Sequence, residues 1–296
     1  MKVLVTGATG YVGSAVCEAL RLASHQVIGL VRSPEKIAAL QAAGYSALSG
    51  DLTDLDLLRA AARAADGVIH AALDHSPDAG AIDRAAVEAL LTALEGSGKP
   101  FIYTSGVWVY GDTQGRTAGE VSMLHSPAHV AWRPAVEELV LNSKPQGVQG
   151  VVLRPGMVYG RRGGFVAAMF RDARQHGAVK VIGDGHNHWS SVHADDLADL
   201  YVRVLDEPAA GELFVACTGL PQPVRKIALA VTRACGIEGK IELIPLEQAR
   251  AALGAMADCL VLDQRVGSTK ATRYFGWSPR RPSIFFEIFS GSYLPA

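Results

Sequence analysis

The sequence predicts a doubly wound α/β fold, in which helices cover both faces of a parallel β-sheet. Short apolar runs alternate with segments of helical periodicity through the first half of the chain. A glycine-rich turn, TGATGYVG at 6–13, directly follows the first apolar run. The spacing leaves room for right-handed crossovers between parallel strands. In such a fold the ligand binds at the carboxyl ends of the strands.

Strands and helices are expected in strict alternation over the first half. Apolar runs bounded by turn residues predict strands at 2–6, 26–31, 45–49, 67–71, 100–105 and 148–154. Helical spacing predicts helices at 12–23, 53–64 and 82–94. Another helix follows the second strand, with Ser33 as its N-cap and Pro34 at its first position.

The second half of the chain is less regular and predicts a smaller substrate-binding lobe. Loops are expected at 160–164 and 183–188, an acid-rich helix at 193–205, and strands at 213–216 and 241–244. We expect a cofactor-binding core at 1–155 with about 190–217, and the lobe at 156–189 and 218–296. No clear linker separates them, so one shared core is expected.

Composition and charge exclude several classes of function. The chain has 296 residues, 49% hydrophobic and 19% charged, and a formal net charge of −1. These values are typical of a soluble globular protein and do not indicate a nucleic-acid partner. No apolar run approaches the roughly 20 residues that span a bilayer, and no signal segment is apparent, so a cytoplasmic location is expected. Four scattered cysteines without a C-x-x-C pair indicate reduced thiols.

The turn after the first strand predicts a dinucleotide site. Gly7 permits a sharp exit from the strand, Gly10 lets the backbone approach a diphosphate, and Gly13 lets the helix pack closely. The common dehydrogenase fingerprint has glycine where this chain has Ala8. The following helix N-terminus favours phosphate binding. The expected contacts are Gly7, Ala8, Thr9, Gly10, Tyr11, Val12 and Gly13.

The end of the second strand indicates which dinucleotide binds. An acid there would hold the ribose hydroxyls of NAD, but the chain has Arg32 and Ser33. A guanidinium pairs well with a 2′-phosphate, so NADP(H) is favoured over NAD(H). The alternative is a solvated arginine. Asp51 and Leu52 follow the third strand, where an Asp can reach the adenine amino group or serve as an ordinary turn residue.

Seven segments together resemble the extended short-chain dehydrogenase/reductase superfamily, of the NAD-dependent epimerase/dehydratase type. They are TGATGYVG, GDLTD at 50–54, VIHAA at 68–72, YTSGVWVYG at 103–111, LRPGMVYG at 153–160, WSSVHADDLA at 189–198 and KATRYFGWSP at 270–279. The resemblance implies a Rossmann-like sheet, a small-molecule substrate and a homodimer packed through helices. It also implies that Ala71 and Ala72 lie beside the nicotinamide ribose, that Pro155, Gly156, Met157 and Val158 wall the nicotinamide, and that His193 and Asp195 link lobe and sheet.

The chain departs from this family at the catalytic triad. The family implies a Ser or Thr after the fifth strand, then a Tyr and a Lys four residues apart on a helix. Gly106 occupies the Ser/Thr position, with the Ser105 hydroxyl beside it. His129 and Arg133 fall at the Tyr and Lys positions, counted from Glu137.

The replacements keep part of the expected chemistry. An imidazole at 129 can exchange a proton near neutral pH, whereas Arg133 can donate to ribose hydroxyls but cannot release a proton. Pro134 predicts either a kinked helix or a helix that begins near that residue, and both weaken a shared face for the pair. The alternatives are a lining role for His129 and a surface or glutamate-paired Arg133.

Several other side chains are candidate proton donors or binding groups. Tyr110 is a candidate donor, as are His75, Tyr159, His186 and His188, although structural roles fit them equally well. His186 and His188 lack a third ligand at metal spacing, so no metal site is expected. An apolar pocket is expected from Trp108, Tyr110, Met157, Phe165, Met169, Phe170 and Trp189.

Three functions are consistent with these features. The favoured one is an NADPH-dependent reductase of a small carbonyl or conjugated compound, with an imidazole, a hydroxyl or water as proton donor. The second is a sugar-nucleotide epimerase or dehydratase, against which the missing Tyr and the presence of Arg32 both count. The third is a non-catalytic NADP-binding regulator.

Overall fold

The computed structural model describes residues 1–294, which form two compact units. Unit 1 comprises 1–105, 132–154 and 198–214. Unit 2 comprises 106–131, 155–197 and the described residues from 215 on. Residues 106–131 thus group with unit 2, whereas the division drawn from the sequence placed them within 1–155.

Unit 1 is built on the parallel sheet that the sequence predicts, which confirms the α/β class. The strand order is β12-β7-β5-β4-β1-β2-β3. The strands are β1 (Lys2–Thr6), β2 (Gln26–Val31), β3 (Ser46–Ser49), β4 (Gly67–His70), β5 (Pro100–Thr104), β7 (Gln149–Pro155) and β12 (Glu212–Ala216). The chain runs outward from β1 to β3, then returns to β4 on the other side of β1. This reversal between β1 and β4 is the topological switch point, where ligands of such sheets bind.

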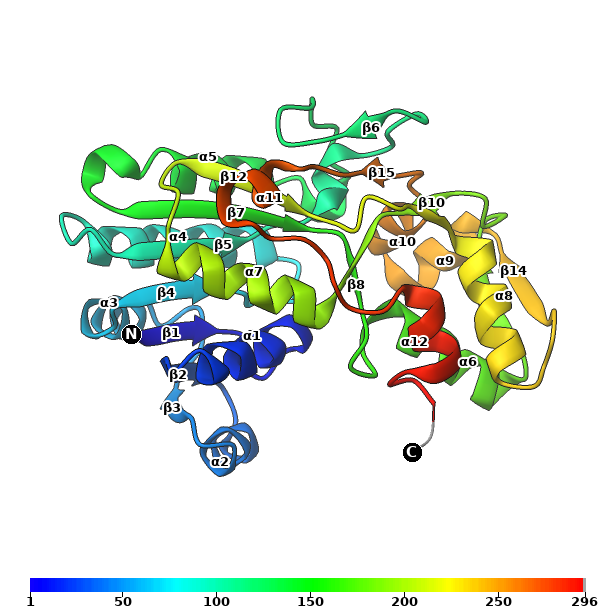
Figure 1. The fold of residues 1–296 in the computed structure, drawn as a ribbon, viewed down its shortest axis with the longest axis horizontal. Coiled ribbons are helices and arrows are strands. Elements are labelled where there is room, and N and C mark those ends of the chain that lie inside the picture. Colours follow the sequence, from blue (N-terminus) through cyan, green and yellow to red (C-terminus); the bar gives the residue numbers. More distant parts are fainter. Residues whose placement is uncertain (295–296) are drawn as a thin grey trace. The chain divides into compact units, whose positions relative to one another are not determined.

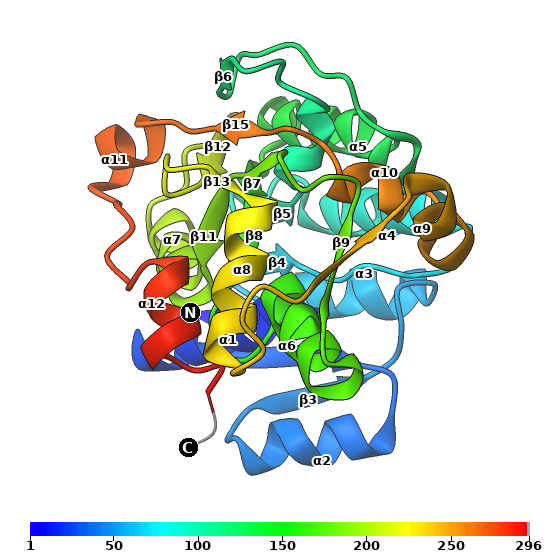
Figure 2. The same cartoon turned by 90° about the vertical axis from the view of Figure 1, so that its right-hand side faces the viewer.

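Helices cover both faces of this sheet (Figures 1 and 2). One face carries α1 (Tyr11–Leu22) and α7 (Ala194–Asp206), which belongs to unit 1 from Ala198 on; the other carries α3 (Leu55–Ala64), α4 (Ala79–Leu94) and α5 (Arg133–Leu141). The remaining helices of the unit are α2 (Pro34–Ala42) and the 3-10 turn η3 (Lys144–Gln146). Leu58 and Leu90 are buried with Phe101 and Val136 beneath α3, α4 and α5. Burial of each such side chain contributes about 1.5–3 kcal/mol.

The segment around the expected Tyr and Lys positions is not one helix. His129 lies in the 3-10 turn η2 (Ala128–Val130), and α5 begins only at Arg133 with Pro134 in its first turn. Of the two expectations, a kink or a late start, the late start is observed. A proline is tolerated there because the first N–H groups of a helix have no helical partner.

The described part of unit 2 contains short strand pairs, six whole helices and the first turn of α7 around its own core. The pairs are β8 (Met157–Tyr159) with β11 (Ser191–His193), β9 (Val179–Ile182) with β14 (Ile241–Ile244), β10 (His188–Trp189) with β13 (Gln222–Pro223), and β6 (Thr117–Ala118) with β15 (Arg265–Val266). Its helices are α6 (Gly164–His176), α8 (Val224–Ala234), α9 (Leu246–Leu253), α10 (Met256–Leu260), α11 (Lys270–Phe275) and α12 (Ile284–Ser290), with the 3-10 turns η1 (Val107–Tyr110) and η2. Helices α6, α8 and α12 pack together (Figure 2), and Phe170, Val231 and Ile288 are buried among them.

Across residues 1–294, no helix combines the length and the apolar character that crossing a bilayer requires.

Candidate active site

The glycine bend has a geometry that side chains at two of its positions would prevent. Gly7 has a φ of +72°, a conformation that L-residues with side chains rarely adopt. A Cβ at Gly7 would lie 2.7 Å from Ala71 O, and one at Gly13 would lie 2.1 Å from Gly7 O. The bend is closed by Gly10 N, which donates to Gly7 O at 2.8 Å. The first strand, the first helix and the end of β4 therefore meet without intervening side chains.

A cleft of about 540 Å3 runs along the carboxyl ends of β1 to β4, entirely within unit 1. It is lined by Gly7, Thr9, Gly10, Tyr11, Val12, Leu30, Val31, Arg32, Lys36, Gly50, Asp51, Leu52, Thr53, Ala71, Ala72, Leu73, Asp74, His75 and Ile82. Most of the expected cofactor contacts of the first four strands are therefore brought together. Ala8 and Gly13 are buried behind the bend, and Ser33 Oγ accepts from Lys36 N at 3.4 Å as an N-cap.

The residues of this cleft fit a dinucleotide. Gly10 is exposed and N-caps α1, whose first turn contains no acid to repel a phosphate. The unpaired N–H groups and the dipole of a helix N-terminus favour an anion at such a position. We therefore expect the diphosphate to be held by backbone N–H groups of the bend.

Two cations and two acids surround the end of the cleft next to β2. The Arg32 side chain is 65% exposed, with Nη1 3.5 Å from Asp74 Oδ2. Lys36, in the first turn of α2, also lines the cleft and was not among the residues expected there. Asp51 accepts from Thr53 N at 2.7 Å and from Thr53 Oγ1 at 2.6 Å. These hydrogen bonds lower the pKa of Asp51, which serves here as a turn residue.

A buried carboxylate on α4 forms hydrogen bonds with side chains from several other parts of unit 1. Asp83 is only 3% exposed. Its Oδ1 lies 3.0 Å from His70 Nε2, and its Oδ2 accepts from Tyr103 OH at 2.6 Å and from Trp132 Nε1 at 3.0 Å. Burial by itself would raise the pKa of Asp83, but the hydrogen bonds from His70 and Tyr103 and the charge of Arg133 hold it below its usual value. An ionised carboxylate thus joins α4 to β4, β5 and the start of α5.

This carboxylate is linked to the glycine bend by a chain of hydrogen bonds. His70 Nδ1 lies 2.9 Å from Thr6 Oγ1, and Ala72 N donates to Thr6 Oγ1 at 3.3 Å. With a neutral ring, the acceptor Asp83 requires the proton on Nε2, so Nδ1 accepts from the Thr6 hydroxyl. The Thr6 lone pairs then face Ala72 N–H, and the wall of the cleft is fixed next to Gly7.

Arg133 lies at the carboxyl end of β5. Its Nη1 donates to Thr104 O at 2.7 Å, and its guanidinium lies 5.7 Å from the centre of the Trp132 ring. Glu137 forms a buried ion pair with Arg154, whose Nε donates at 2.9 Å, so the glutamate-paired alternative for Arg133 is not observed. A guanidinium carries five N–H donors, so the contact with Thr104 leaves donors for a ribose.

Two hydroxyls end the fifth strand, and they differ in their partners. Thr104 Oγ1 is 2.6 Å from the buried Tyr201 OH. Ser105 is buried, its backbone N–H donates to Leu153 O, and its Oγ has no hydrogen-bond partner among residues 1–294. Such an atom costs about 1–3 kcal/mol, so a partner brought by a ligand would stabilise it.

The remaining expected residues lie in unit 2. His129 is half-buried, and its ring meets the Trp108 ring edge-on with centroids 6.0 Å apart. Tyr110 is 2% exposed within η1, a position that does not suit a proton donor to a substrate.

The segment expected to wall the nicotinamide enters β8. Gly156 N donates to Ala216 O at 3.0 Å, and a Cβ at Gly156 would lie 2.5 Å from Ser190 O. Pro155 is buried, whereas Met157 and Val158 are half-buried. Glycine is thus needed at 156 for close packing of β8 inside unit 2.

The other histidines have partners of their own. His193 Nδ1 accepts from Asp195 N at 3.1 Å, and His193 Nε2 lies 3.6 Å from Glu287 Oε1. His188 pairs with Asp263 at 2.7 Å, and His186 pairs with Asp184 at 3.2 Å. His75 lines the dinucleotide cleft. Within residues 1–294, no group of three His, Cys, Asp or Glu side chains is placed to hold a metal.

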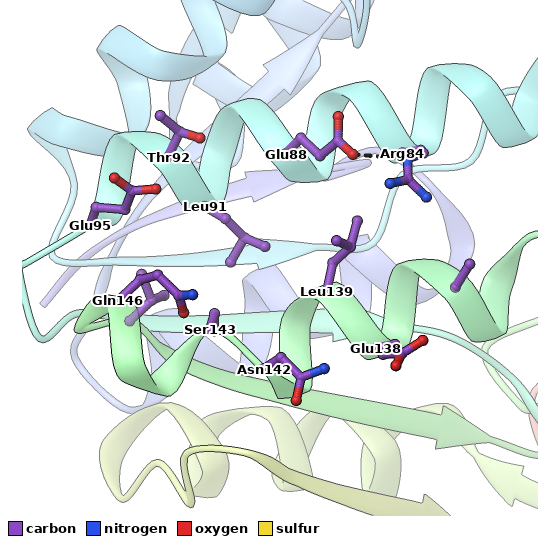
Figure 3. A pocket seen from close by; sticks show the side chains of 12 residues that line it. Arg84, Glu88, Leu91, Thr92, Glu95, Glu138, Leu139, Asn142, Ser143 and Gln146 are labelled. Atoms are coloured by element: carbon purple, nitrogen blue, oxygen red, sulfur yellow. Dashed lines mark ion pairs between the residues drawn. The ribbon is translucent and has the colours of Figure 1, made fainter.

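A second hollow of unit 1, about 500 Å3, lies between α4 and α5 and shares no residue with the cleft (Figure 3). Arg84 Nε pairs with Glu88 at 2.8 Å on its rim, and Leu91 and Leu139 line it (Figure 3). The homodimer packed through helices stays a prediction.

Comparisons with known proteins agree with the geometry of the cleft. The model of the "NAD dependent epimerase/dehydratase family" matches residues 3–217. An uncharacterized protein of Schizosaccharomyces pombe is 33% identical over 99% of this chain and 100% of its own. The 2-alkyl-3-oxoalkanoate reductase of Stenotrophomonas maltophilia is 28% identical over 80% of this chain and 76% of its own. The fold is shared with the UDP-glucose 4-epimerase of Thermus thermophilus in complex with NAD, at a TM-score of 0.81 and 22% identity, covering 99% of this chain and 98% of that one.

Proposed function

The chain belongs to the NAD-dependent epimerase/dehydratase family, and from that premise we propose that it is an NADPH-dependent reductase of a small carbonyl or conjugated compound. The family and its relatives are NAD-dependent oxidoreductases and epimerases, which supports an enzyme. The similarity to a 2-alkyl-3-oxoalkanoate reductase supports carbonyl reduction in particular.

The observation that carries the proposal is a pair of cations, Arg32 directly after β2 and Lys36 in the first turn of α2. Arg32 and Lys36 line the cleft where an acid would select NAD. A 2′-phosphate at this position would accept charge-assisted hydrogen bonds from Arg32. These hydrogen bonds would replace the 3.5 Å contact between Arg32 Nη1 and Asp74 Oδ2.

The chain's own groups would serve the reaction in different ways. The bound dinucleotide supplies the hydride, and the protein positions it and supplies the proton. Arg133 would hold ribose hydroxyls and keep its proton, whereas Ser105 Oγ would donate a hydrogen bond to the substrate oxygen. His129 would deliver the proton, because an imidazole titrates near neutral pH.

Sugar-nucleotide epimerisation or dehydration is less well supported, since both begin with an oxidation that needs an efficient base for a hydroxyl proton. The Tyr and Lys that the family implies for this step are His129 and Arg133 in this chain. No described feature favours a non-catalytic regulator over an enzyme.

The test measures loss of reduced-nicotinamide absorbance with a panel of ketones, aldehydes and conjugated enones, using NADPH and NADH in parallel. The proposal expects turnover with NADPH and much weaker turnover with NADH. Tightly bound NAD in the purified protein, together with conversion of a nucleotide sugar, would refute the reductase and identify the protein as an epimerase or dehydratase. Binding of NADPH without turnover of any panel member would replace the reductase with the regulator.

A further inference from the structure

We propose that an apolar cavity of unit 2 binds a hydrocarbon group, an alkyl chain or an aromatic ring, carried by the carbonyl substrate. The inference deepens the proposed reductase by naming the class of its substrate, and it rests on that function only for the identity of the reacting group. The cavity has a volume of about 500 Å3, within the range of small-molecule sites.

The inner walls of this cavity are aromatic, thioether and aliphatic side chains from several elements of unit 2. Phe165 and Met169 come from α6, Ile182 from β9, Trp189 from β10, and Leu253 and Met256 from α9 and α10. Trp189 is held in place because its Nε1 donates to Leu260 O at 3.2 Å, so its polar atom is satisfied by the backbone. Flexible thioethers beside fixed aromatic rings suit a hydrocarbon group of variable shape.

The charged residues of the cavity lie where solvent reaches them. Arg171 on α6 and Lys180 on β9 are exposed, and Asp172 on α6 is half-buried. Sugar hydroxyls against the inner wall would lose hydrogen bonds to water without gaining partners from Phe165, Met169 or Trp189. The lining therefore favours an apolar group inside and a polar group at the rim.

A row of aromatic rings connects this cavity to the candidate proton donor within unit 2. The Trp189 and Phe165 centroids are 5.9 Å apart, and those of Phe165 and Trp108 are 6.1 Å apart. Trp108 in turn meets the His129 ring at 6.0 Å. A substrate whose hydrocarbon group lies against Phe165 and Trp189 therefore has an apolar surface that continues to His129.

Binding of straight-chain methyl ketones of increasing length tests the inference without requiring turnover. Calorimetry and quenching of tryptophan fluorescence give the affinities, and UDP-glucose is titrated as the polar competitor. We expect each added methylene to raise the affinity about threefold to fourfold until the cavity is filled, the factor that burial of one methylene supplies. Affinity that is independent of chain length, or UDP-glucose that binds more tightly than the longest ketone, would overturn the assignment.

A pair of variants on α9 localises the effect. Ala252 lines the cavity, whereas Ala251, also exposed on the same helix, does not. Ala252→Phe should weaken binding of the longest ketone at least tenfold, with NADPH affinity and unfolding midpoint unchanged, and Ala251→Phe should leave ketone binding unchanged. Equal behaviour of the two variants would refute the location.

Turnover then separates the two proposals. Chain-length-dependent binding without NADPH oxidation would refute the reductase and leave the cavity assignment standing. NADPH oxidation of short and long ketones with equal kcat/KM would refute the cavity and leave the reductase standing.

Discussion

Removal of the Asp83 carboxylate should destabilise unit 1 more than a typical single substitution does. The carboxylate is the shared partner of His70, Tyr103 and Trp132, at 3.0, 2.6 and 3.0 Å. Asp83→Ala leaves the buried His70 and Tyr103 and the half-buried Trp132 without that acceptor. Each costs about 1–3 kcal/mol, and water entering the space recovers part of the sum, so we expect a loss of about 3–6 kcal/mol. That is a large share of the roughly 5–15 kcal/mol that stabilises a domain.

The assay is equilibrium unfolding in urea, followed by circular dichroism and tryptophan fluorescence. Glu88→Ala is the matched control, because Glu88 is also on α4 but half-exposed and paired only across the surface with Arg84. Such surface changes stay within about 0.5 kcal/mol. If Asp83→Ala unfolds with the free energy of the Glu88→Ala variant, the buried network does not hold these elements together.

The pH dependence of stability provides a second measure of the same group. The pKa of Asp83 lies below its ordinary 3.8 in the folded protein. Its contribution is therefore fully present above pH 3.8 and is lost as the pH falls through the folded-state pKa. Asp83→Asn should flatten the acid limb of the stability curve, and an unchanged limb would assign the acid sensitivity to other carboxylates.

Three further substitutions test the cleft and the chemistry. Gly13→Ala places a Cβ 2.1 Å from Gly7 O, so the bend must shift, and NADPH affinity should fall at least tenfold by calorimetry; unchanged affinity would refute the bend as the phosphate site. Arg32→Ala should raise the Kd for NADPH about 10- to 100-fold, equivalent to about 1.5–3 kcal/mol for a charged hydrogen bond, with the Kd for NADH unchanged. An equal loss for both cofactors would remove the 2′-phosphate contact. His129→Ala should lower kcat by about 10²–10⁴ while NADPH binding persists, and an unchanged kcat would exclude it as proton donor.

Local patterns predict the glycine bend and the elements on either side of it. The run KVLVT and the glycines at 7, 10 and 13 are consecutive in sequence, so the strand, the bend and the helix start are encoded within about a dozen residues. Likewise, Ser33 and Pro34 mark the start of α2 by capping chemistry that needs no distant partner.

Features that depend on contacts between distant segments are harder to predict from the sequence. Asp83 accepts from residues 13, 20 and 49 positions away. The sequence nevertheless contains an indication that Asp83 is buried. It is an acid on the apolar face of α4, in helical register with Ala79, Ala86 and Leu90. The strand β9 (VKVI) was not predicted from the sequence. Its pairing with β14 determines its structure more than its alternation of apolar and polar residues does.

Calorimetric titration of the wild-type protein with NADPH and with NADH tests the central claim most directly. That claim is that the cleft at the glycine bend holds a dinucleotide whose extra phosphate meets Arg32. The account predicts one NADPH bound per chain, at least ten times more tightly than NADH. Absence of heat with both cofactors would contradict the site itself, and equal affinities would contradict its preference for the phosphate.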